Sequence, residues 1–310
     1  MGQVVIEADK LTKAYNGKVV VDHLDLKIAE GEIFGFLGPN GAGKTTTMLM
    51  FLGLTEPTSG MARIAGFNST REPLKVKRLT GYVPEKVGFY DDLTAGYNLA
   101  YTARLNRLTE AEVDKRVAHS LEVVGLGDKG DQKVGTFSKG MKQRLAIADV
   151  LVKEPRVAFL DEPTTGIDPE GISKMLDLIS RIAKEKNMTI ILSSHQLNQV
   201  ERICHRVGIM AKGKLVVEGP IEELGARARG GKYQVEVKTT EITDVILSAI
   251  GRIKGVLKTE RSGDTLLVTC TEDLRPLIAR AIIDNQGMLV EMKIHTQGLE
   301  DIYLKYFKEA

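Results

Sequence analysis

Short, almost wholly apolar runs alternate with segments of helical periodicity over residues 1–224. The runs EIFGFLG, RVAFLDE and TIILSSH are typical of strands that are buried on both faces of a sheet. Such strands occur mainly in parallel sheets that are covered by helices. We therefore predict an α/β fold for residues 1–224, with a parallel sheet flanked by helices.

The pattern becomes mostly helical between about residues 85 and 150. Thr109 followed by Glu112 forms a capping box, which marks the start of a helix. The apolar residues that follow fall on one helical face, and they are Val113, Val117, Leu121 and Val124. We interpret residues 85–150 as a helical subdomain inserted into the sheet domain.

The pattern changes again after residue 224. The segment GARARGGK at 225–232 holds little that could join a core, so we interpret it as a linker. Beyond it, strand and helix patterns follow in the order β-α-β-β-α-β, with an SGD hairpin turn and a helix stopped by Gly287. LEDIYLKYFK then closes the chain as a helix. This order predicts a small α+β, ferredoxin-like domain at 233–310.

Composition narrows the function classes only a little. Hydrophobic residues make up 43% and charged residues 27%, as in ordinary globular proteins. The net charge of +2 is too balanced to favour nucleic acid, so we expect no such partner. Cys204 and Cys270 form no CxxC motif and predict neither a disulfide framework nor a zinc site. No apolar run approaches the roughly 18 residues of a spanning helix, so the chain itself is not expected to cross a membrane.

The first motif with a chemical meaning is GPNGAGKTT at 38–46. It fits G-x-x-x-x-G-K-[ST], follows the apolar run IFGFL and opens a helix, which is the context of a phosphate-binding loop. Its glycines let backbone N–H groups turn inward around a phosphate. Lys44 is predicted to reach the β- and γ-phosphates, and the Thr45 hydroxyl to bind Mg²⁺. The predicted nucleotide-binding residues are Gly38, Pro39, Asn40, Gly41, Ala42, Gly43, Lys44, Thr45 and Thr46.

A second strand end carries two acids. The apolar residues 157–160 lead to Asp161, and Glu162 and Pro163 follow at once. Neighbouring side chains on a strand point to opposite faces, so both acids serve one site only if the chain turns at the strand's end. Pro163 favours such a turn. We predict Asp161 as the acid on the Mg²⁺ side and Glu162 as the group that polarises the attacking water.

Three further motifs complete a set. GTFSKGMKQRLAIADVL at 135–151 predicts an amphipathic helix with Ser138 as its N-cap. PTTGIDP follows the acidic pair, and SSHQ follows the third apolar run. In order and spacing, the five motifs make residues 3–222 resemble the ATP-binding subunit of an ABC transporter. The resemblance implies an ATPase that uses ATP and Mg²⁺, with Lys44, Glu162 and His195 as its catalytic residues.

The resemblance also implies that each site is shared by two subunits. The signature residues are Ser138, Lys139, Gly140 and Met141. They would contact the γ-phosphate of an ATP held by a second ATP-binding subunit, in a head-to-tail homodimer. Asp168 fits the loop that crosses between the sites, His195 the switch histidine and Tyr15 the aromatic that stacks on adenine. A separate transmembrane permease and a peripheral position on the cytoplasmic face of the membrane are further implications.

Two motifs depart from the family pattern. The usual signature reads Leu-Ser-Gly-Gly-Gln, whereas residues 137–141 read Phe-Ser-Lys-Gly-Met. The two phosphate-facing positions are kept, so the change is expected to tune rate or dimer affinity. The family's glutamine after the first half-domain is replaced by Glu85. Since a carboxylate can reach Mg²⁺ or water, we predict Glu85 as a magnesium ligand beside Thr45 and Asp161.

The YVPE and SKGM forms and the C-terminal domain resemble the exporter branch often called ABC-2. That branch includes drug and sodium exporters and the ATPase that serves maturation of nitrous oxide reductase, which the KVGFY run and the HTQGLEDIYLKYFKEA ending favour. An importer ATPase with a regulatory ferredoxin-like tail is the alternative. Repair ATPases need a long coiled coil between Lys44 and Asp161, and ribosomal ones carry two cassettes, so both are disfavoured. Glu162 and His195 disfavour a non-catalytic regulator.

Overall fold

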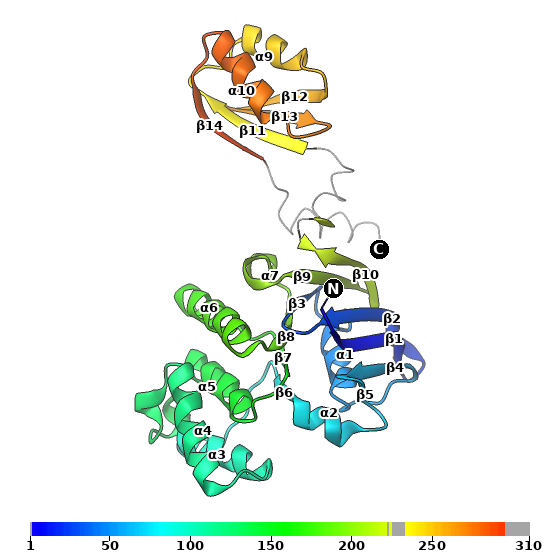
Figure 1. Cartoon of the computed structure of the whole chain (residues 1–310), viewed down its shortest axis with the longest axis vertical. Coiled ribbons are helices and arrows are strands. Elements are labelled where there is room, and N and C mark those ends of the chain that lie inside the picture. The colour runs from blue at the N-terminus through cyan, green and yellow to red at the C-terminus, as the bar shows by residue number, and fades with distance from the viewer. Residues whose placement is uncertain (1, 222, 225–232, 295–310) are drawn as a thin grey trace. The chain divides into compact units, whose positions relative to one another are not determined.

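The computed structural model describes residues 2–221, 223–224 and 233–294. The chain divides into two compact units, with the boundary between Gly219 and Pro220 (Figure 1). The predicted linker at 225–232 and the predicted closing helix lie outside the described residues. No helix in the part of the chain that the structure describes combines the length and apolar character needed to span a membrane.

A largely parallel sheet lies at the centre of the first unit, in the strand order β10-β9-β3-β8-β7-β6. The pairs β9–β3, β3–β8, β8–β7 and β7–β6 are all parallel. Every residue of β3, β7 and β8 is buried, which confirms the prediction from their apolar runs. The strands are β3 (Ile33–Leu37), β6 (Thr80–Val83), β7 (Val157–Asp161), β8 (Thr189–Ser194), β9 (Arg206–Ala211) and β10 (Lys214–Pro220).

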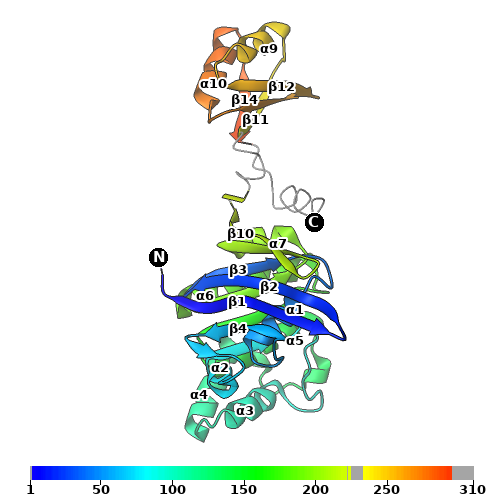
Figure 2. The same cartoon turned by 90° about the vertical axis from the view of Figure 1, so that its right-hand side faces the viewer.

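A second sheet in this unit is antiparallel, in the order β2-β1-β4-β5, and the sequence pattern did not predict it. Its strands are β1 (Val4–Tyr15), β2 (Lys18–Ala29), β4 (Ser59–Ile64) and β5 (Phe67–Asn68). One buried apolar cluster contains Leu11 and Leu24 of this sheet, Phe34 of β3 and Phe51 of α1 (Lys44–Phe51). The helix that follows the phosphate loop is therefore fixed by packing to both sheets (Figure 2).

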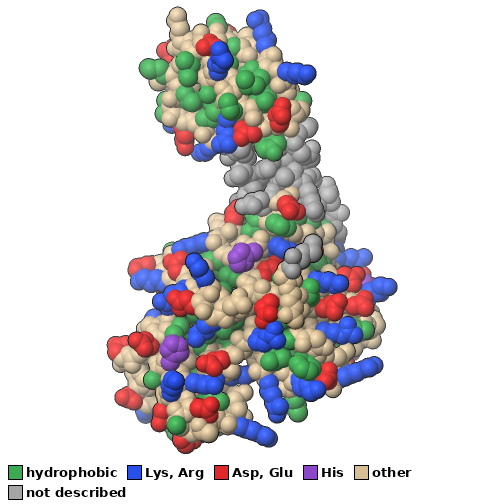
Figure 3. Space-filling view, in the orientation of Figure 1, with side chains coloured by type: hydrophobic (Ala, Val, Ile, Leu, Met, Phe, Trp, Pro, Cys, Tyr) green, Lys and Arg blue, Asp and Glu red, His purple; other side chains and the backbone are tan. Residues whose placement is uncertain are grey.

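Helices fill the remainder of the first unit. α3 and α4 follow β6 in the chain, and the predicted capping box is present, with the Thr109 N–H donating to Glu112 Oε2 at 2.9 Å. The helices are α2 (Pro73–Leu79), α3 (Ala95–Leu105), α4 (Glu110–Val123), α5 (Lys139–Val152), α6 (Pro169–Lys186) and α7 (Leu197–Ile203). Figure 3 shows Lys and Arg interspersed with Asp and Glu over the visible face of this unit, in keeping with the small net charge.

The second unit follows the order β-α-β-β-α-β, with an antiparallel sheet in the order β12-β13-β11-β14. Valines of β11 and β13 and isoleucines of α9 and α10 form its core. Helix α10 ends at Asp284, and Gln286, with φ +62°, takes the left-handed turn. The predicted stop, Gly287, lies one residue after this left-handed residue. The elements are β11 (Tyr233–Thr239), α9 (Asp244–Gly251), β12 (Val256–Ser262), β13 (Thr265–Cys270), α10 (Arg275–Asp284) and β14 (Leu289–Ile294).

Candidate active site

The loop between β3 and α1 forms the floor of the site. Gly43 is the N-cap of α1 with φ +106°, and a Cβ there would lie 2.7 Å from the Val20 carbonyl oxygen. Gly38 is equally restricted, since a Cβ would approach the Met210 carbonyl oxygen to 2.4 Å. No side chain caps α1 and no acidic residue lies in its first turn. The N–H groups at this helix start can therefore receive an anion.

Lys44 lies inside this loop. Its side chain is only 6% exposed, and its Nζ donates to the carbonyl oxygens of Gly38 at 2.6 Å and Pro39 at 3.2 Å. Burial lowers the pKa of Lys44, and the carboxylates of Glu162 and Asp161 oppose that shift. The ammonium group is held by the loop backbone at the point where a phosphate would enter.

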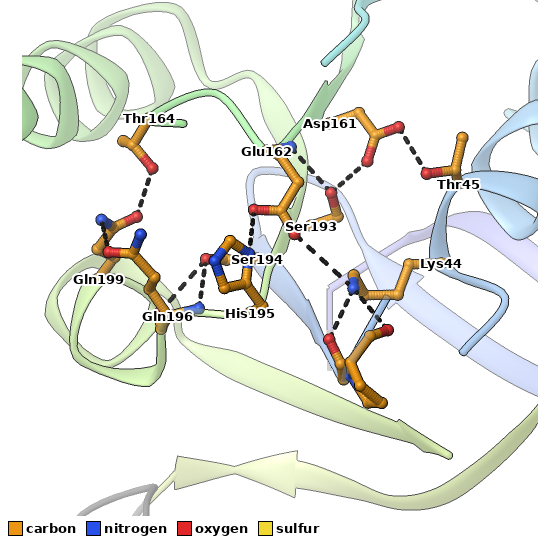
Figure 4. Close-up of polar contacts among 12 residues, drawn as sticks. Lys44, Thr45, Asp161, Glu162, Thr164, Ser193, Ser194, His195, Gln196 and Gln199 are labelled. Carbon is orange, nitrogen blue, oxygen red and sulfur yellow. Dashed lines mark hydrogen bonds and ion pairs between the residues drawn. The ribbon is translucent and has the colours of Figure 1, made fainter. Parts of the chain in front are cut away.

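Asp161 ends β7 and accepts hydrogen bonds on both carboxylate oxygens. The Thr45 hydroxyl donates to Oδ2 at 2.7 Å, and the Ser193 hydroxyl donates to Oδ1 at 2.5 Å (Figure 4). Ser193 is the register partner of Asp161 in the parallel pair β7–β8. Burial, together with Asp161, raises the pKa of Tyr82 to about 12, so this phenol stays protonated beside the carboxylate.

Glu162 has a left-handed backbone, with φ +49°. The chain thus turns at the end of β7, and both acids line the same pocket. The backbone N–H of Glu162 stabilises this turn by donating to Ser193 Oγ at 3.0 Å. A non-glycine residue in this conformation is uncommon and costs free energy, which is typical of a position under functional constraint.

The Glu162 carboxylate lies between a cation and an imidazole. Its Oε2 is 2.8 Å from His195 Nδ1, and its Oε1 is 3.7 Å from Lys44 Nζ. Oε1 is buried and has no hydrogen-bond partner among the described residues. A buried carboxylate oxygen without a donor is costly unless a ligand supplies one. This atom therefore has the properties of an acceptor for a water molecule in the pocket.

The predicted residues 40–46, Glu85, Asp161 and Glu162 line one pocket of about 200 Å³, whereas Gly38, Pro39 and His195 are not among its lining residues. Thr45, Asp161 and Glu85 line it, and their hydroxyl and carboxylate oxygens are the hard ligands that Mg²⁺ prefers. The described residues contain no group of three or more His, Cys, Asp or Glu that could bind a metal alone. Phosphate and water oxygens would have to complete the coordination of Mg²⁺, which is the usual arrangement in nucleotide enzymes.

Tyr15 is not among the residues that line this pocket. It is the last residue of β1, its side chain is exposed, and the Lys13 ammonium lies 4.8 Å from the ring centroid. The adenine contact stays a prediction. An exposed ring at a strand end is nevertheless free to stack on a planar ligand.

The predicted signature residues lie around a different hollow, of about 570 Å³. The Ser138 hydroxyl caps α5 by accepting from the Met141 N–H at 3.3 Å, as the sequence predicts. Asp168 caps α6 in the same way, through the Gly171 N–H at 3.2 Å. The residues from the signature and the crossing loop that line the hollow include Ser138, Lys139, Gly140, Met141, Gly166, Ile167 and Asp168. Within one chain, the signature residues and the phosphate loop therefore line separate pockets.

Polar side chains that were not predicted as site residues support the site. Ser193 holds both acids, and the buried Gln199 forms hydrogen bonds with the buried Thr164 and the exposed Gln196 beside His195 (Figure 4). Ser193 could have been found from the rule that neighbouring parallel strands end at the same edge of a sheet. Gln199 had only a weak signal, as a polar residue four positions after a candidate histidine.

Comparison with known proteins identifies relatives of the whole arrangement. The sequence profile of the family described as ABC transporter matches residues 21–165. The chain is 45% identical over 225 residues to the bacitracin transport ATP-binding protein BcrA of Bacillus licheniformis, covering 73% of this chain and 72% of that protein. It is 35% identical over 309 residues to the Nod factor export ATP-binding protein I of Paraburkholderia xenovorans, covering 98% and 97%.

Among solved structures, CbiO1 of Clostridium perfringens, described as part of the ABC transporter complex cbiONQ, has a TM-score of 0.67 at 30% identity. The match covers 72% of this chain and 91% of that chain. The family that the motifs indicated is thus confirmed, and two relatives carry names of transport or export. The resemblance to the nitrous oxide reductase maturation ATPase stays a prediction.

Proposed function

The chain belongs to the ATP-binding proteins of ABC transporters, and on that premise we propose that it is the ATP-hydrolysing subunit of an exporter. In this proposal two copies close head to tail around two ATP molecules and drive a separate transmembrane permease. One observation carries the catalytic part: Lys44, Thr45, Asp161 and Glu162 line one pocket, and His195, which is not among the lining residues, contacts the Glu162 carboxylate.

Each catalytic role follows from a contact in that pocket. The N–H groups at the start of α1 and the Lys44 ammonium bind the phosphates, and Lys44 exchanges its carbonyl partners for phosphate oxygens. Mg²⁺, held by Thr45 and Asp161 with Glu85 nearby, would neutralise charge on the phosphates. Glu162 Oε1 accepts a proton of the attacking water, and His195 orients the carboxylate through Oε2. Positioning and charge stabilisation do most of the work.

The separation of the two hollows supports the dimer. The capped start of α5 offers N–H groups and partial positive charge to an anion, but the phosphate loop of the same chain lines another pocket. Pairing two copies head to tail supplies each signature with the other's ATP. One chain carries both halves of the composite site, which favours a homodimer. Asp168 then lies on the loop that crosses between the two sites.

The relatives support the exporter assignment and the permease partner. One is named for bacitracin transport, one for Nod factor export, and the CbiO1 structure is described as part of a transporter complex. A peripheral position on the cytoplasmic face of the membrane accompanies that partner. We further infer that the second unit is a ferredoxin-like accessory domain, since its element and strand orders are those of the split βαβ motif. The Nod factor relative aligns across that unit.

The experiment that tests the proposal is purification of the tagged full-length chain at native expression in mild detergent with ATP and vanadate. We expect a polytopic membrane protein in stoichiometric amount, whose addition raises the ATPase rate of the purified chain. The Lys44→Ala variant is the matched control. Its ATPase rate should not rise when the membrane protein is added, because it cannot undergo ATP-dependent closure. If only ribosomes, DNA or soluble proteins were recovered, the transport assignment would be refuted, although the ATPase assignment would stand.

A further inference from the structure

Gln199 lies in the first turn of α7 and is only 7% exposed. Both ends of its amide are used: Oε1 accepts from the Thr164 hydroxyl at 2.5 Å, and Nε2 donates to Gln196 Oε1 at 2.5 Å (Figure 4). A buried amide that is hydrogen-bonded at both ends restrains the segments it joins, because breaking either bond leaves a buried polar atom of the amide unsatisfied.

The two partners of Gln199 belong to the two segments that carry the catalytic pair. Thr164, which is 3% exposed, follows Glu162 by two residues, and Gln196 follows His195 directly. Gln196 is held a second time, since its N–H donates to Ser194 Oγ at 2.9 Å. The side chains of Thr164, Gln199 and Gln196 thus link the turn after β7 to the turn after β8.

This link matters because packing alone does not hold the imidazole. The His195 side chain is 45% exposed, and its Nδ1 lies 2.8 Å from Glu162 Oε2. A half-exposed ring keeps one orientation only if its backbone is fixed relative to its partner. Glu162 is fixed on its side by Ser193, and the bonds of Gln199 fix the two loops relative to each other.

We propose that Gln199 is a positioning residue for ATP hydrolysis, which sets the Glu162–His195 geometry through Thr164 and Gln196. The inference rests on the proposed ATPase mechanism and deepens it. Gln199 does not line the nucleotide pocket, and its side-chain hydrogen bonds go to Thr164 and Gln196, so its effect on the reaction is indirect. We therefore expect that replacing Gln199 lowers the rate of the chemical step and leaves ATP binding unchanged.

The test begins with Gln199→Leu, Thr164→Val and the double variant in the full-length chain. We expect kcat for ATP hydrolysis to fall about 10- to 100-fold in each, the range expected from misplacing a catalytic group, with KM for ATP within about twofold. The double variant removes both partners of one hydrogen bond, which is less destabilising than leaving either one alone. It therefore keeps the test open if a single variant folds poorly.

A double-mutant cycle with His195→Ala separates positioning from general destabilisation. If Gln199 acts through His195, adding Gln199→Leu to His195→Ala should lower single-turnover hydrolysis by less than about twofold. A full additional loss in that background, or wild-type kcat in the folded double variant Thr164→Val/Gln199→Leu, would overturn the proposal.

Asn98→Ala is the matched control. Asn98 is a buried amide on α3 that bonds the Tyr90 and Thr94 backbones, away from the site. It should lower Tm while leaving kcat within about twofold, because its bonds fix only the helical segment.

The Glu162→Gln variant distinguishes failure of the proposed ATPase mechanism from failure of the positioning role of Gln199. Normal turnover in Glu162→Gln would refute the proposed mechanism. If Glu162→Gln loses turnover but the effects of Gln199→Leu and His195→Ala are additive, only the positioning role of Gln199 is refuted.

Discussion

Replacing Glu162 by glutamine tests the proposed general base of ATP hydrolysis directly. The change keeps the shape of the side chain and removes its charge. In the structure the carboxylate serves His195 with Oε2 and faces the Lys44 ammonium with Oε1. A glutamine cannot reproduce both contacts, since an amide that accepts from His195 turns its NH₂ group toward Lys44.

The expected magnitude follows from these two losses. Loss of a general base lowers hydrolysis by about 10²–10⁴-fold, equivalent to about 2.7–5.4 kcal/mol of transition-state stabilisation. The 3.7 Å separation from Lys44 corresponds to an attraction of about 4.5 kcal/mol at an effective dielectric of 20, which desolvation of both groups largely offsets. Removing that charge leaves Lys44 less compensated without nucleotide, so we expect a lower Tm of the free protein and tighter ATP binding.

Three measurements check this in one preparation: phosphate release at saturating ATP, ATP affinity by calorimetry, and molar mass by light scattering with ATP. The variant should bind ATP, stay dimeric and hydrolyse very slowly. Glu110→Gln is the control, because this exposed acid pairs with Arg104 at the surface and should leave turnover unchanged. Turnover of the Glu162 variant within about threefold of wild type would refute the assigned role.

Further predictions concern the phosphate loop, the cap of α5 and the two buried cysteines. Lys44→Ala should weaken ATP binding by about 10–100-fold, since it removes a charge-assisted bond to phosphate; unchanged affinity in calorimetry would contradict the phosphate-loop assignment. Ser138→Arg should leave monomeric ATP binding intact and abolish ATP-dependent dimers, so a normal dimer mass would contradict the composite site. Burial raises the pKa of the Cys204 and Cys270 thiols, so at pH 8 both hold less thiolate than a free cysteine. Thiol labelling should be more than about tenfold slower in the native chain than in denaturant, and equal rates would contradict that burial.

The sequence predicted the parallel sheet well because β3, β7 and β8 are buried on both faces and appear as continuous apolar runs. It did not predict the antiparallel sheet, because β1 and β2 do not keep a strict alternation. Their pairing shifts register several times, and Lys10 and His23 have left-handed backbones within the strands. Each irregularity interrupts the alternation, so the clear period-two pattern is confined to residues 23–28 of β2, and β1 shows only shorter stretches.

The site shows the same division between local and long-range information. Lys44, Thr45, Asp161 and Glu162 were predicted because each lies in a short motif whose chemistry depends on adjacent residues. Ser193 acquires its contacts from strand register, 32 residues away from Asp161 in sequence, and the SSHQ motif that contains it does not indicate that it contacts the acids. The left-handed turn at Glu162 was inferred only in outline, from the need to bring two neighbouring acids to one side.

The cap of α5 restricts sequence choice more narrowly than helix stability does. The Ser138 oxygen accepts from the Met141 N–H, while its own proton remains available to donate outward. Aspartate caps a helix as well as serine, but it has no proton to give and repels phosphate. In a saturation library, selection for folding alone should therefore retain aspartate at this position, whereas selection for transport should eliminate it.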